Sequence, residues 1–391
     1  MQAQFSRCLE FVLPKGYSSF FWGARKTGKS TYLKQNYPES VRIDFLKADV
    51  FQHYFRSPHA LREEIMANQE KFLKRPIIID EVQKVPLVLD EVHWMIENIP
   101  GIQFILCGSS VRKLKQTGSN LLGGRALRNM FLPLCYPEMK GSWDWVRMMN
   151  HGLLPSHYLS QYAPKLLSSY VVDYLIPEVH MEANIRNSQA FTRFLDVIGF
   201  CLGEMLNFSN IARDCGVSSK TVQVYFDILA DMYLGYYVYP YRGKSRRQII
   251  QEMPKFYLMD VGLANHLKRF RFSGFHGVEA GRAFEHYVFL ELMAYKLYKD
   301  HPTKIEYWRT KNGEEVDFIL NGGDLAIEVK IVTPIQQKDL KNLVVFGTDH
   351  KSSLNIVSLE PKKRLMTLDG HSITVWPIEE FLQDLWAGRI L

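Results

Sequence analysis

The segment Gly23–Ser30 has the residue types and the spacing of a loop that binds phosphate groups. It reads GARKTGKS, follows the apolar run Ser18–Trp22 and precedes a predicted helix that begins at Ser30. Glycines near both ends permit a tight loop whose backbone N–H groups point at phosphate oxygens, and the helix N-terminus adds partial positive charge there. We expect Lys29 to reach the outer phosphates of ATP and the Ser30 hydroxyl to bind Mg²⁺. The expected nucleotide-binding set is Gly23, Ala24, Arg25, Lys26, Thr27, Gly28, Lys29, Ser30 and Thr31.

A second motif, Pro76–Glu81, is an apolar run that ends in two carboxylates. Such a run predicts a buried parallel strand, and parallel sheets bind ligands beyond the carboxyl ends of their strands. We expect Asp80 to hold the Mg²⁺ ion through water and Glu81 to orient and polarise the attacking water. The alternative is a buried strand followed by a charged surface turn. The phosphate loop upstream, in a strand–loop–helix context, favours the nucleotide site.

Two further positions are candidates for contact with the reacting phosphate. The apolar run Ile102–Cys107 is followed by a glycine and two serines, which places Ser109 beside the γ-phosphate, with Ser110 as the neighbouring alternative. The same serines could instead cap the next helix. Arg125 follows a glycine pair, and an arginine on a positioned loop stabilises transition-state charge in cis or from a neighbouring subunit. An ordinary surface arginine is the alternative.

The composition predicts several globular domains and excludes some classes of function. The chain has 391 residues, of which 47% are hydrophobic and 23% are charged, so two to four domains with their own cores are expected. The net charge of +7 favours an anionic partner only weakly, because 48 basic and 41 acidic residues are well mixed. The five cysteines form no C-x-x-C pair and no Cys/His cluster, which argues against zinc and fits a reducing cytosol. The start lacks the apolar core of a signal peptide and no apolar run reaches 18 residues, so we expect a cytoplasmic protein without a membrane span.

The order of apolar runs and amphipathic stretches predicts an α/β architecture with four parts. Residues 1–140 alternate strand-like and helix-like patterns, typical of a doubly wound parallel sheet, with Phe131–Cys135 as the expected last strand. Residues 141–206 carry apolar positions at helical spacing and predict a helical lid or spacer. Residues 207–250 and 251–391 form the third and fourth parts.

Residues 207–250 have the pattern of a winged helix-turn-helix. Asn207 or Ser209 can cap a first helix, Gly216 permits the tight turn, and the following strand-like run Leu234–Val238 suggests a wing. In a DNA-reading module the second helix would face the major groove and basic residues beyond the wing would contact phosphates. The groove-facing residues would be Ser218, Ser219, Lys220 and Gln223, and the phosphate contacts Arg242, Lys244, Arg246 and Arg247. Such modules also serve as protein-packing units in ATPases, and that alternative stays open.

Residues 251–391 contain a second set of residues that could perform chemistry. A predicted helix carries Glu285, a predicted hairpin carries Asp317, and a third strand carries Glu328 and Lys330 on one face. Two carboxylates on adjacent strands make an oxygen-ligand pocket for Mg²⁺, and a nearby lysine can activate water or neutralise a phosphate. Glu285, Asp317 and Glu328 are therefore the expected metal ligands, with Lys330 as a catalytic residue. The alternative is a charged, exposed strand face without a function.

The joint order of these motifs resembles the AAA-type ATPases of bacteria and archaea that fuse a phosphate-loop domain, a winged helix and a C-terminal domain of unknown function related to PD-(D/E)xK nucleases. The resemblance covers nearly the whole chain and rests on GARKTGKS, IIIDE, CGSS, GGR, KFYLMDVGL, GRAFEH, VDF and IEVK. It implies ATP binding through Lys29 and Ser30, Mg²⁺ binding through Asp80 and hydrolysis assisted by Glu81. It also implies a nuclease-like core at Glu285, Asp317, Glu328 and Lys330. Trp22 before the loop and Cys107 at the end of the third strand depart from the family pattern without removing a catalytic group.

These observations together predict a Mg²⁺-dependent ATPase. Its nucleotide cycle would reposition a winged helix and a restriction-endonuclease-like domain that acts on DNA or RNA. The protein could also assemble into a homo-oligomer. One alternative is a regulatory switch that binds protein partners through ATP turnover, with a catalytically silent nuclease fold as a scaffold. Another is a DNA-binding sensor that does not cleave.

Overall fold

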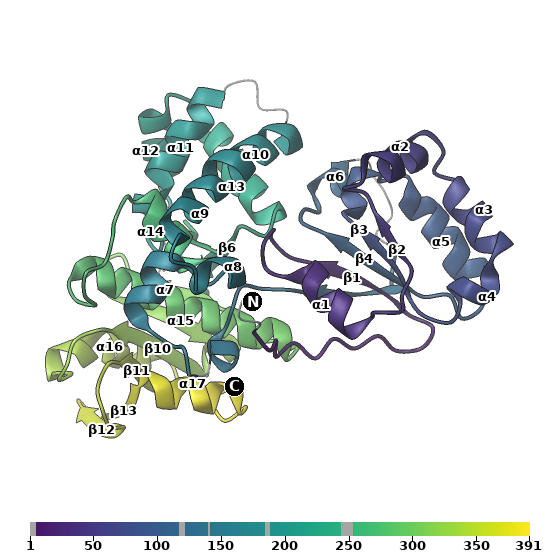
Figure 1. Cartoon of the computed structure of the whole chain (residues 1–391). Coiled ribbons are helices and arrows are strands. Elements are labelled where there is room, and N and C mark those ends of the chain that lie inside the picture. The colour runs from purple at the N-terminus through teal and green to yellow at the C-terminus, as the bar shows by residue number, and fades with distance from the viewer. Residues whose placement is uncertain (1–4, 117–121, 140, 184–187, 244–252) are drawn as a thin grey trace.

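The computed structural model describes residues 5–116, 122–139, 141–183, 188–243 and 253–391. Figure 1 shows two lobes: an N-terminal α/β lobe and a larger lobe in which the middle helices lie beside the C-terminal sheet. The first part of the chain lies between the lobes, close to helix α1 (Lys29–Asn36).

A five-stranded parallel sheet in the order β2-β3-β4-β1-β5 forms the N-terminal lobe. Its strands are β1 (Ser18–Trp22), β2 (Arg42–Asp44), β3 (Ile77–Asp80), β4 (Phe104–Gly108) and β5 (Ala126–Met130). Its helices are α1, α2 (Ala48–Arg56), α3 (Ala60–Ala67), α4 (Gln69–Phe72), η1 (Val82–Lys84), α5 (Val88–Asn98) and α6 (Arg112–Gln116). Alternate residues of one strand enter two different cores, Phe20 on one face and Phe21 on the other. Both faces are thus covered, which explains why the central strands are continuous apolar runs.

The predicted last strand, Phe131–Cys135, is wrong. The fifth strand is β5, which pairs in parallel with β1, and residues 131–135 form an irregular segment after it. The segment is apolar because it is buried rather than because it is extended: Phe131 is fully buried and its N–H donates to the Trp22 carbonyl at 2.7 Å. A Cβ at Gly23 would lie 2.1 Å from the Phe131 carbonyl oxygen, so only glycine fits at the start of the phosphate loop.

The middle segment is helical, as the apolar spacing predicts. Its elements are η2 (Tyr136–Met139), α7 (Trp145–His151), α8 (Pro155–Tyr158), α9 (Ala163–Ser169), the π-helix η3 (Tyr170–Leu175), α10 (Ile176–Ala183), α11 (Ser188–Cys201), α12 (Phe208–Cys215) and α13 (Ser219–Asp231). The helix-turn-helix pattern is confirmed as two helices and a turn. Asn207 caps α12, Gly216 takes a left-handed conformation at φ 69°, and the Ser218 side chain accepts a hydrogen bond from the Thr221 N–H to cap α13.

The C-terminal part is built on an eight-stranded sheet in the order β12-β13-β11-β10-β9-β8-β6-β7. The strands are β6 (Gly235–Pro240), β7 (Lys255–Leu258), β8 (Glu306–Arg309), β9 (Glu315–Leu320), β10 (Leu325–Lys330), β11 (Ser353–Ser358), β12 (Arg364–Leu368) and β13 (His371–Pro377). The helices are α14 (Val261–Leu267), α15 (Val278–Tyr298), η4 (Asn321–Gly323), η5 (Gln337–Leu340), α16 (Lys341–Asp349) and α17 (Ile378–Trp386). Strands β8, β9 and β10 match the predicted hairpin and third strand. Nowhere in the described ranges is a helix both long and apolar enough to cross a membrane.

The strand predicted as a wing belongs to this same sheet. β6 pairs antiparallel with β7 and parallel with β8, where Tyr239 is opposite Glu306. The domain boundary expected between residues 250 and 251 therefore falls within one continuous sheet. Lys244, Arg246 and Arg247, predicted as phosphate contacts beyond the wing, lie outside the described residues.

Candidate nucleotide site and C-terminal carboxylate cluster

The phosphate loop connects the buried strand β1 to helix α1. Gly23 and Gly28 have φ of 153° and 101°, and Lys26 adopts a left-handed φ of 68°, which curls the backbone into a tight loop. Lys29 begins α1 and is 7% exposed, with its Nζ donating to the carbonyl oxygens of Gly23 at 2.5 Å and Ala24 at 2.9 Å. Burial lowers the pKa of Lys29. The loop thus presents a desolvated ammonium group beside a helix N-terminus, which together favour an anion.

Strand β3 delivers Asp80 to the loop. The Ser30 hydroxyl donates to Asp80 Oδ2 at 3.0 Å, and Arg42 Nη1 lies 3.8 Å from the same oxygen. Burial raises the pKa of Asp80, and the bond from Ser30 partly opposes that shift. A hydroxyl and a carboxylate held together at the edge of a parallel sheet are suitable ligands for Mg²⁺, directly or through water.

Glu81 is held by two neighbours. It has a left-handed backbone, with φ 57° and ψ 46°, which turns its side chain back toward the sheet edge. Its Oε2 accepts hydrogen bonds from Gln83 Nε2 at 2.5 Å and from the Ser109 hydroxyl at 3.1 Å. Gln83 Nε2 also donates to Ser109 Oγ at 3.1 Å, so the three side chains form one buried network. Gln83 was not predicted from the sequence, because the left-handed turn at Glu81 is what brings its side chain to this network.

The structure separates the two serines after β4. Ser109 faces Glu81, whereas the Ser110 hydroxyl accepts a hydrogen bond from the Arg112 N–H at the start of α6. Ser109 therefore lies beside Glu81, where the γ-phosphate is expected, and Ser110 caps the helix.

Arg125 lies at the opposite edge of the sheet. Its carbonyl oxygen accepts from the Ser18 N–H at 3.2 Å, at the beginning of β1 rather than at its end. A strand of five residues places that edge about 16 Å from the phosphate loop. The Arg125 guanidinium is bound to Glu97. The predicted role of Arg125 in cis is wrong for this reason, and a role toward a neighbouring subunit stays a prediction.

The outer face of the phosphate loop contacts the middle segment. The Arg25 guanidinium lies 3.1 Å from Glu178 Oε1 on α10 and 4.8 Å from the centre of the Tyr174 ring on η3. The Tyr170 hydroxyl donates to the Arg25 carbonyl at 3.3 Å, and Ala24 is buried in the core of the middle helices. The loop is thus part of the boundary between the two lobes.

A second contact links the nucleotide edge to the helix-turn-helix. The Val111 N–H donates to the Asp231 carbonyl at 3.1 Å, directly after the serine pair of β4. Arg112 and Lys115 on α6 bind the Asp231 carboxylate at 3.3 Å and 2.6 Å. Because Asp231 is the last residue of α13, these contacts join α6 directly to the second helix of that motif.

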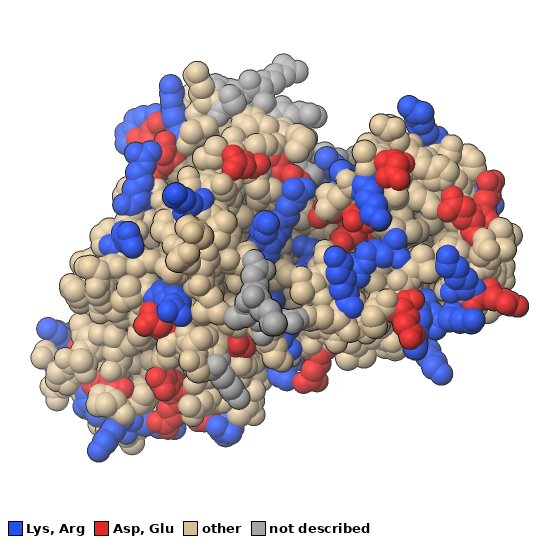
Figure 2. Space-filling model, in the orientation of Figure 1, with Lys and Arg blue, Asp and Glu red and all other residues tan. Residues whose placement is uncertain are grey.

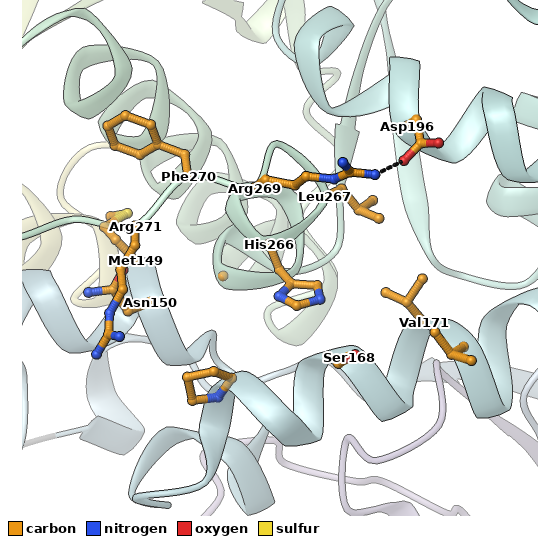
Figure 3. A pocket seen from close by; sticks show the side chains of 13 residues that line it. Met149, Asn150, Ser168, Val171, Asp196, His266, Leu267, Arg269, Phe270 and Arg271 are labelled. Carbon is orange, nitrogen blue, oxygen red and sulfur yellow. Dashed lines mark hydrogen bonds and ion pairs between the residues drawn. The ribbon is translucent and has the colours of Figure 1, made fainter.

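The π-helical segment also lines a cavity on its other side. Figure 3 shows this cavity, of about 440 Å³, between α9, η3, α11 and α14. His266 points into it, and Arg269 at its rim is paired with Asp196 at 2.9 Å. Val171 lines the cavity, one residue from Tyr170, which bonds to the phosphate loop. A π-helix is rare and occurs mostly as a single turn, frequently at a functional site.

The C-terminal carboxylates gather where β9 and β10 meet. The register pairs Ile327 with Phe318, so the next positions along the strands are Glu328 and Asp317, as predicted. Asp317 Oδ2 accepts from the Val329 N–H at 2.7 Å, and Lys330 Nζ lies 2.6 Å from Glu328 Oε1. Burial and the neighbouring Glu328 carboxylate raise the pKa of Asp317 well above its ordinary value. Glu328 is also buried, and its Oε2 has no hydrogen-bond partner among the described residues.

Lys255 and Tyr257 on β7 complete this cluster, and neither had a role assigned from the sequence. Lys255 is 2% exposed, and its Nζ lies 2.5 Å from Glu315 and 3.4 Å from Glu285 on α15. The Tyr257 hydroxyl also bonds to Glu285. Although burial lowers it, the carboxylates raise the pKa of Lys255 well above its ordinary value. Glu285 Oε1 therefore has Lys255 as a cationic partner, as Glu328 Oε1 has Lys330. Glu328 Oε2, by contrast, has no hydrogen-bond partner among the described residues.

The three predicted metal ligands do not form a closed group. Among the described residues, the group whose three ligand atoms lie within 4.8 Å of one another is instead Cys8, Cys135 and Glu138. At the C-terminal cluster, Asp317 and Glu328 are the carboxylates that face each other across neighbouring strands.

Comparisons with known proteins match three successive stretches of the chain. Residues 18–140 match the family model described as AAA domain, residues 142–273 match Domain of unknown function (DUF8612), and residues 280–381 match Domain of unknown function (DUF4143). A solved Walker-type ATPase of Pyrococcus abyssi is similar at 12% identity and a TM-score of 0.42, over 64% of this chain and 91% of that chain. No curated protein matches the chain. Residues 18–140, which contain the phosphate loop between β1 and α1, are thus similar to an AAA domain.

Proposed function

We propose that the chain is a Mg²⁺-dependent ATPase whose nucleotide state is transmitted to the helix-turn-helix and to a C-terminal nuclease-like centre that acts on DNA or RNA. The observation that carries the ATPase part is the hydrogen bond of 3.0 Å between Ser30 on the phosphate loop and Asp80 at the end of β3. It joins the two motifs that a nucleotide site needs at one edge of the sheet.

Each residue of the nucleotide site has a role that follows from its position. Backbone N–H groups of residues 23–31 and the Lys29 ammonium bind the phosphates. When bound to Ser30 and Asp80, Mg²⁺ supplies charge neutralisation at the terminal phosphates. The Glu81 carboxylate accepts a hydrogen bond from the attacking water and orients it. Gln83 and Ser109 hold that carboxylate in place, so they are positioning residues.

Two contacts support transmission from the nucleotide to the rest of the chain. Arg25 joins the loop to α10 through Glu178, and α6 joins the reaction edge to α13 through Asp231. Both begin within a few residues of the phosphate site and end on helices of the larger lobe. On α13, Ser219, Lys220 and Gln223 are exposed and free of the helix cores, as DNA contact requires.

The C-terminal cluster supports a divalent cation between Asp317 and Glu328. The unpartnered, buried Glu328 Oε2 is the observation that favours it, because a buried carboxylate oxygen is costly without a partner. Lys330, 2.6 Å from Glu328, would neutralise charge on a bound phosphodiester. The cation would supply a polarised water for attack on that ester.

Two observations favour the second candidate, a regulatory switch with a silent nuclease fold. The buried Lys255 ammonium lies between Glu285 and Glu315, where it neutralises carboxylates without a metal ion. On the face shown in Figure 2, the described basic and acidic side chains are interspersed over both lobes. A mixed surface of this kind is less favourable to nucleic acid than a continuous basic track.

The ATPase part is tested by Lys29→Ala in the full chain. We expect ATP turnover to fall to background, because the ammonium that neutralises the outer phosphates is lost. Lys34→Ala is the matched control, since Lys34 is exposed on the same helix. Turnover that persists in Lys29→Ala would show that the loop is misinterpreted.

The nuclease part is tested by incubation of the protein with plasmid DNA, linear DNA and RNA in Mg²⁺ or Mn²⁺. Cleavage should be absent in Asp317→Asn and retained in Asp324→Asn, an exposed aspartate seven residues further along. Equal nicking by the wild-type protein and Asp317→Asn would indicate a contaminating nuclease. No cleavage by any of the three proteins, with ATP turnover intact, would favour the switch.

A further inference from the structure

Two cysteines far apart in the sequence lie in contact at the boundary of the lobes. Cys8 Sγ and Cys135 Sγ are 3.4 Å apart, although 127 positions separate the residues. Cys8 is partly exposed on the segment before β1, and Cys135 is 2% exposed on the irregular segment after β5. Neither thiol belongs to the nucleotide site or to the C-terminal cluster.

We propose that Cys8 and Cys135 form a redox-active dithiol that closes into a disulfide when the protein meets a peroxide. A disulfide requires S–S of about 2.05 Å, so the sulfur atoms must approach by about 1.4 Å. Cys8 lies in residues 5–14, which form no helix or strand, so this segment can accommodate the shift. The proposal is independent of the proposed ATPase and nuclease activities.

The reaction proceeds in two balanced steps. The Cys8 thiolate attacks one peroxide oxygen, so an S–O bond forms, the O–O bond breaks, and the leaving hydroxide takes a proton to become water. The Cys135 sulfur then attacks the Cys8 sulfur, the S–S bond forms, and the S–O bond breaks. The leaving hydroxide takes the Cys135 thiol proton to become a second water. The two thiols lose two electrons and the peroxide gains them.

The order of the two steps follows from exposure. Cys8 is the more accessible of the two thiols, since it is partly exposed whereas Cys135 is buried. Burial and the contact with Cys8 raise the pKa of Cys135 well above its ordinary value, which disfavours its thiolate. The accessible cysteine is thus the one that attacks the peroxide, and the buried cysteine then attacks the oxidised Cys8 sulfur.

Glu138 holds the two cysteines side by side. Its Oε1 accepts from the Cys8 N–H at 2.9 Å, and its Oε2 accepts from the Cys135 N–H at 3.2 Å. Arg7 Nε forms an ion pair with Oε1 at 2.9 Å. Both carboxylate oxygens thus have partners and bring the backbones of the two cysteines together. This favours thiol pairing over metal ligation by the same three residues.

The disulfide would covalently link the segments that precede and follow the ATPase domain, a link that we call the clasp. Cys8 precedes and Cys135 follows the whole five-stranded sheet, from Ser18 to Met130. The adjacent Arg7 donates to the Thr27 carbonyl of the phosphate loop at 2.6 Å and to the Tyr298 hydroxyl of α15 at 3.2 Å. Oxidation would thus lock the junction at which the phosphate loop meets the C-terminal lobe.

The linkage is tested on the reduced full chain treated with hydrogen peroxide, then alkylated and digested without reductant. We expect mass spectrometry to find a peptide pair joined through Cys8 and Cys135, and two of the five thiols to be lost. Cys201→Ser, the matched control in the middle segment, should lose the same two thiols, and Cys8→Ser should lose none. A different pairing, a Cys8 sulfinate without a linkage, or equal thiol loss in Cys8→Ser would overturn the proposal.

The clasp is tested by thermal melting of the oxidised and reduced chain. The melting temperature of the ATPase domain should rise by at least about 5 °C on oxidation, because the bond closes a very long loop. Dithiothreitol should reverse the rise, and Cys8→Ser should not show it. An unchanged melting temperature in a chain fully linked through Cys8 and Cys135 would overturn the clasp. Both tests use Cys8→Ser rather than Cys135→Ser, because Cys8 is only partly buried and its substitution is less disruptive to folding than that of the buried Cys135.

Discussion

Replacing Glu178 with glutamine is expected to tighten the binding of MgATP about five-fold. The Glu178 carboxylate lies 3.1 Å from the Arg25 guanidinium on the phosphate loop and neutralises it. A triphosphate competes with this carboxylate for the cationic groups of the loop. The substitution Glu178→Gln keeps the shape of the side chain and removes its charge, so the loop becomes more positive toward the nucleotide.

The magnitude follows from the exposure of the pair. Two unit charges at that separation attract by about 5 kcal/mol at an effective dielectric constant of about 20. The Arg25 side chain is 34% exposed and that of Glu178 is 10% exposed, so solvent screening and desolvation reduce the net value to about 1 kcal/mol. A difference of that size corresponds to about a five-fold change in the dissociation constant.

The assay is a calorimetric titration with a slowly hydrolysed MgATP analogue at low and high salt. Glu39→Gln is the matched control, because the ion pair of Glu39 with Arg75 is exposed and lies in the N-terminal lobe away from the phosphate loop. The effect of Glu178→Gln should disappear in an Arg25→Ala background and shrink at high salt. Unchanged or weaker binding by Glu178→Gln, or an equal change in Glu39→Gln, would refute the reasoning.

Three further predictions concern the reaction, the metal ion and pH. Glu81→Gln should bind MgATP normally and lower kcat at least about 100-fold, because an amide cannot polarise the water as a carboxylate does; a steady-state ATPase assay with near-normal kcat would count against that role. Ser30→Ala removes the hydroxyl bound to Asp80, so the Mg²⁺ concentration for half-maximal turnover should rise about ten-fold, and an unchanged Mg²⁺ titration would contradict this. Burial raises the pKa of Glu291 to about 7 from 4.5, so between these values the folded chain binds a proton that the unfolded chain has lost. Wild-type stability should therefore fall as pH rises through that window, by at most about 3 kcal/mol, whereas melting curves of Glu291→Gln should be flatter; identical pH profiles would disprove the assignment.

The nucleotide site could be predicted from the sequence because its signals are local. The loop Gly23–Ser30 and the run ending at Asp80 are each short, and parallel-strand topology alone places their ends together. The same logic predicted Ser109 beside the γ-phosphate, at the carboxyl end of its strand, and in the structure its hydroxyl bonds to Glu81. Gln83 could not be assigned, because its role depends on the left-handed turn at Glu81.

Arg125 and Phe131–Cys135 show where local patterns are insufficient. The strand after the glycine pair is β5, so the arginine precedes it and lies at the far edge of the sheet. Strand β5 (Ala126–Met130) is only partly buried and contains polar residues, so it does not form the apolar run by which the other strands were predicted. The apolar segment after them is buried against the phosphate loop and α15 instead.

The C-terminal cluster could be predicted only in part, because some of its residues are close in sequence and others are distant. Asp317 and Glu328 lie on sequential antiparallel strands, so their pairing follows from a short hairpin. Lys255 lies at the far edge of the sheet in strand order, and only the tertiary fold brings its ammonium group to Glu285. Long-range pairings of this kind leave no periodic signal in the sequence.

The continuous sheet from β7 through β6 to β8 has a consequence for any attempt to dissect the chain. A fragment that begins at residue 280 would lose two strands and leave β8 as a bare edge, open to pairing with other molecules. A fragment that ends at residue 243 would carry β6 without either of its partners. Truncations should therefore retain residues 141–391 as one piece. Limited proteolysis that releases the helix-turn-helix as a soluble, folded unit would be unexpected for this topology.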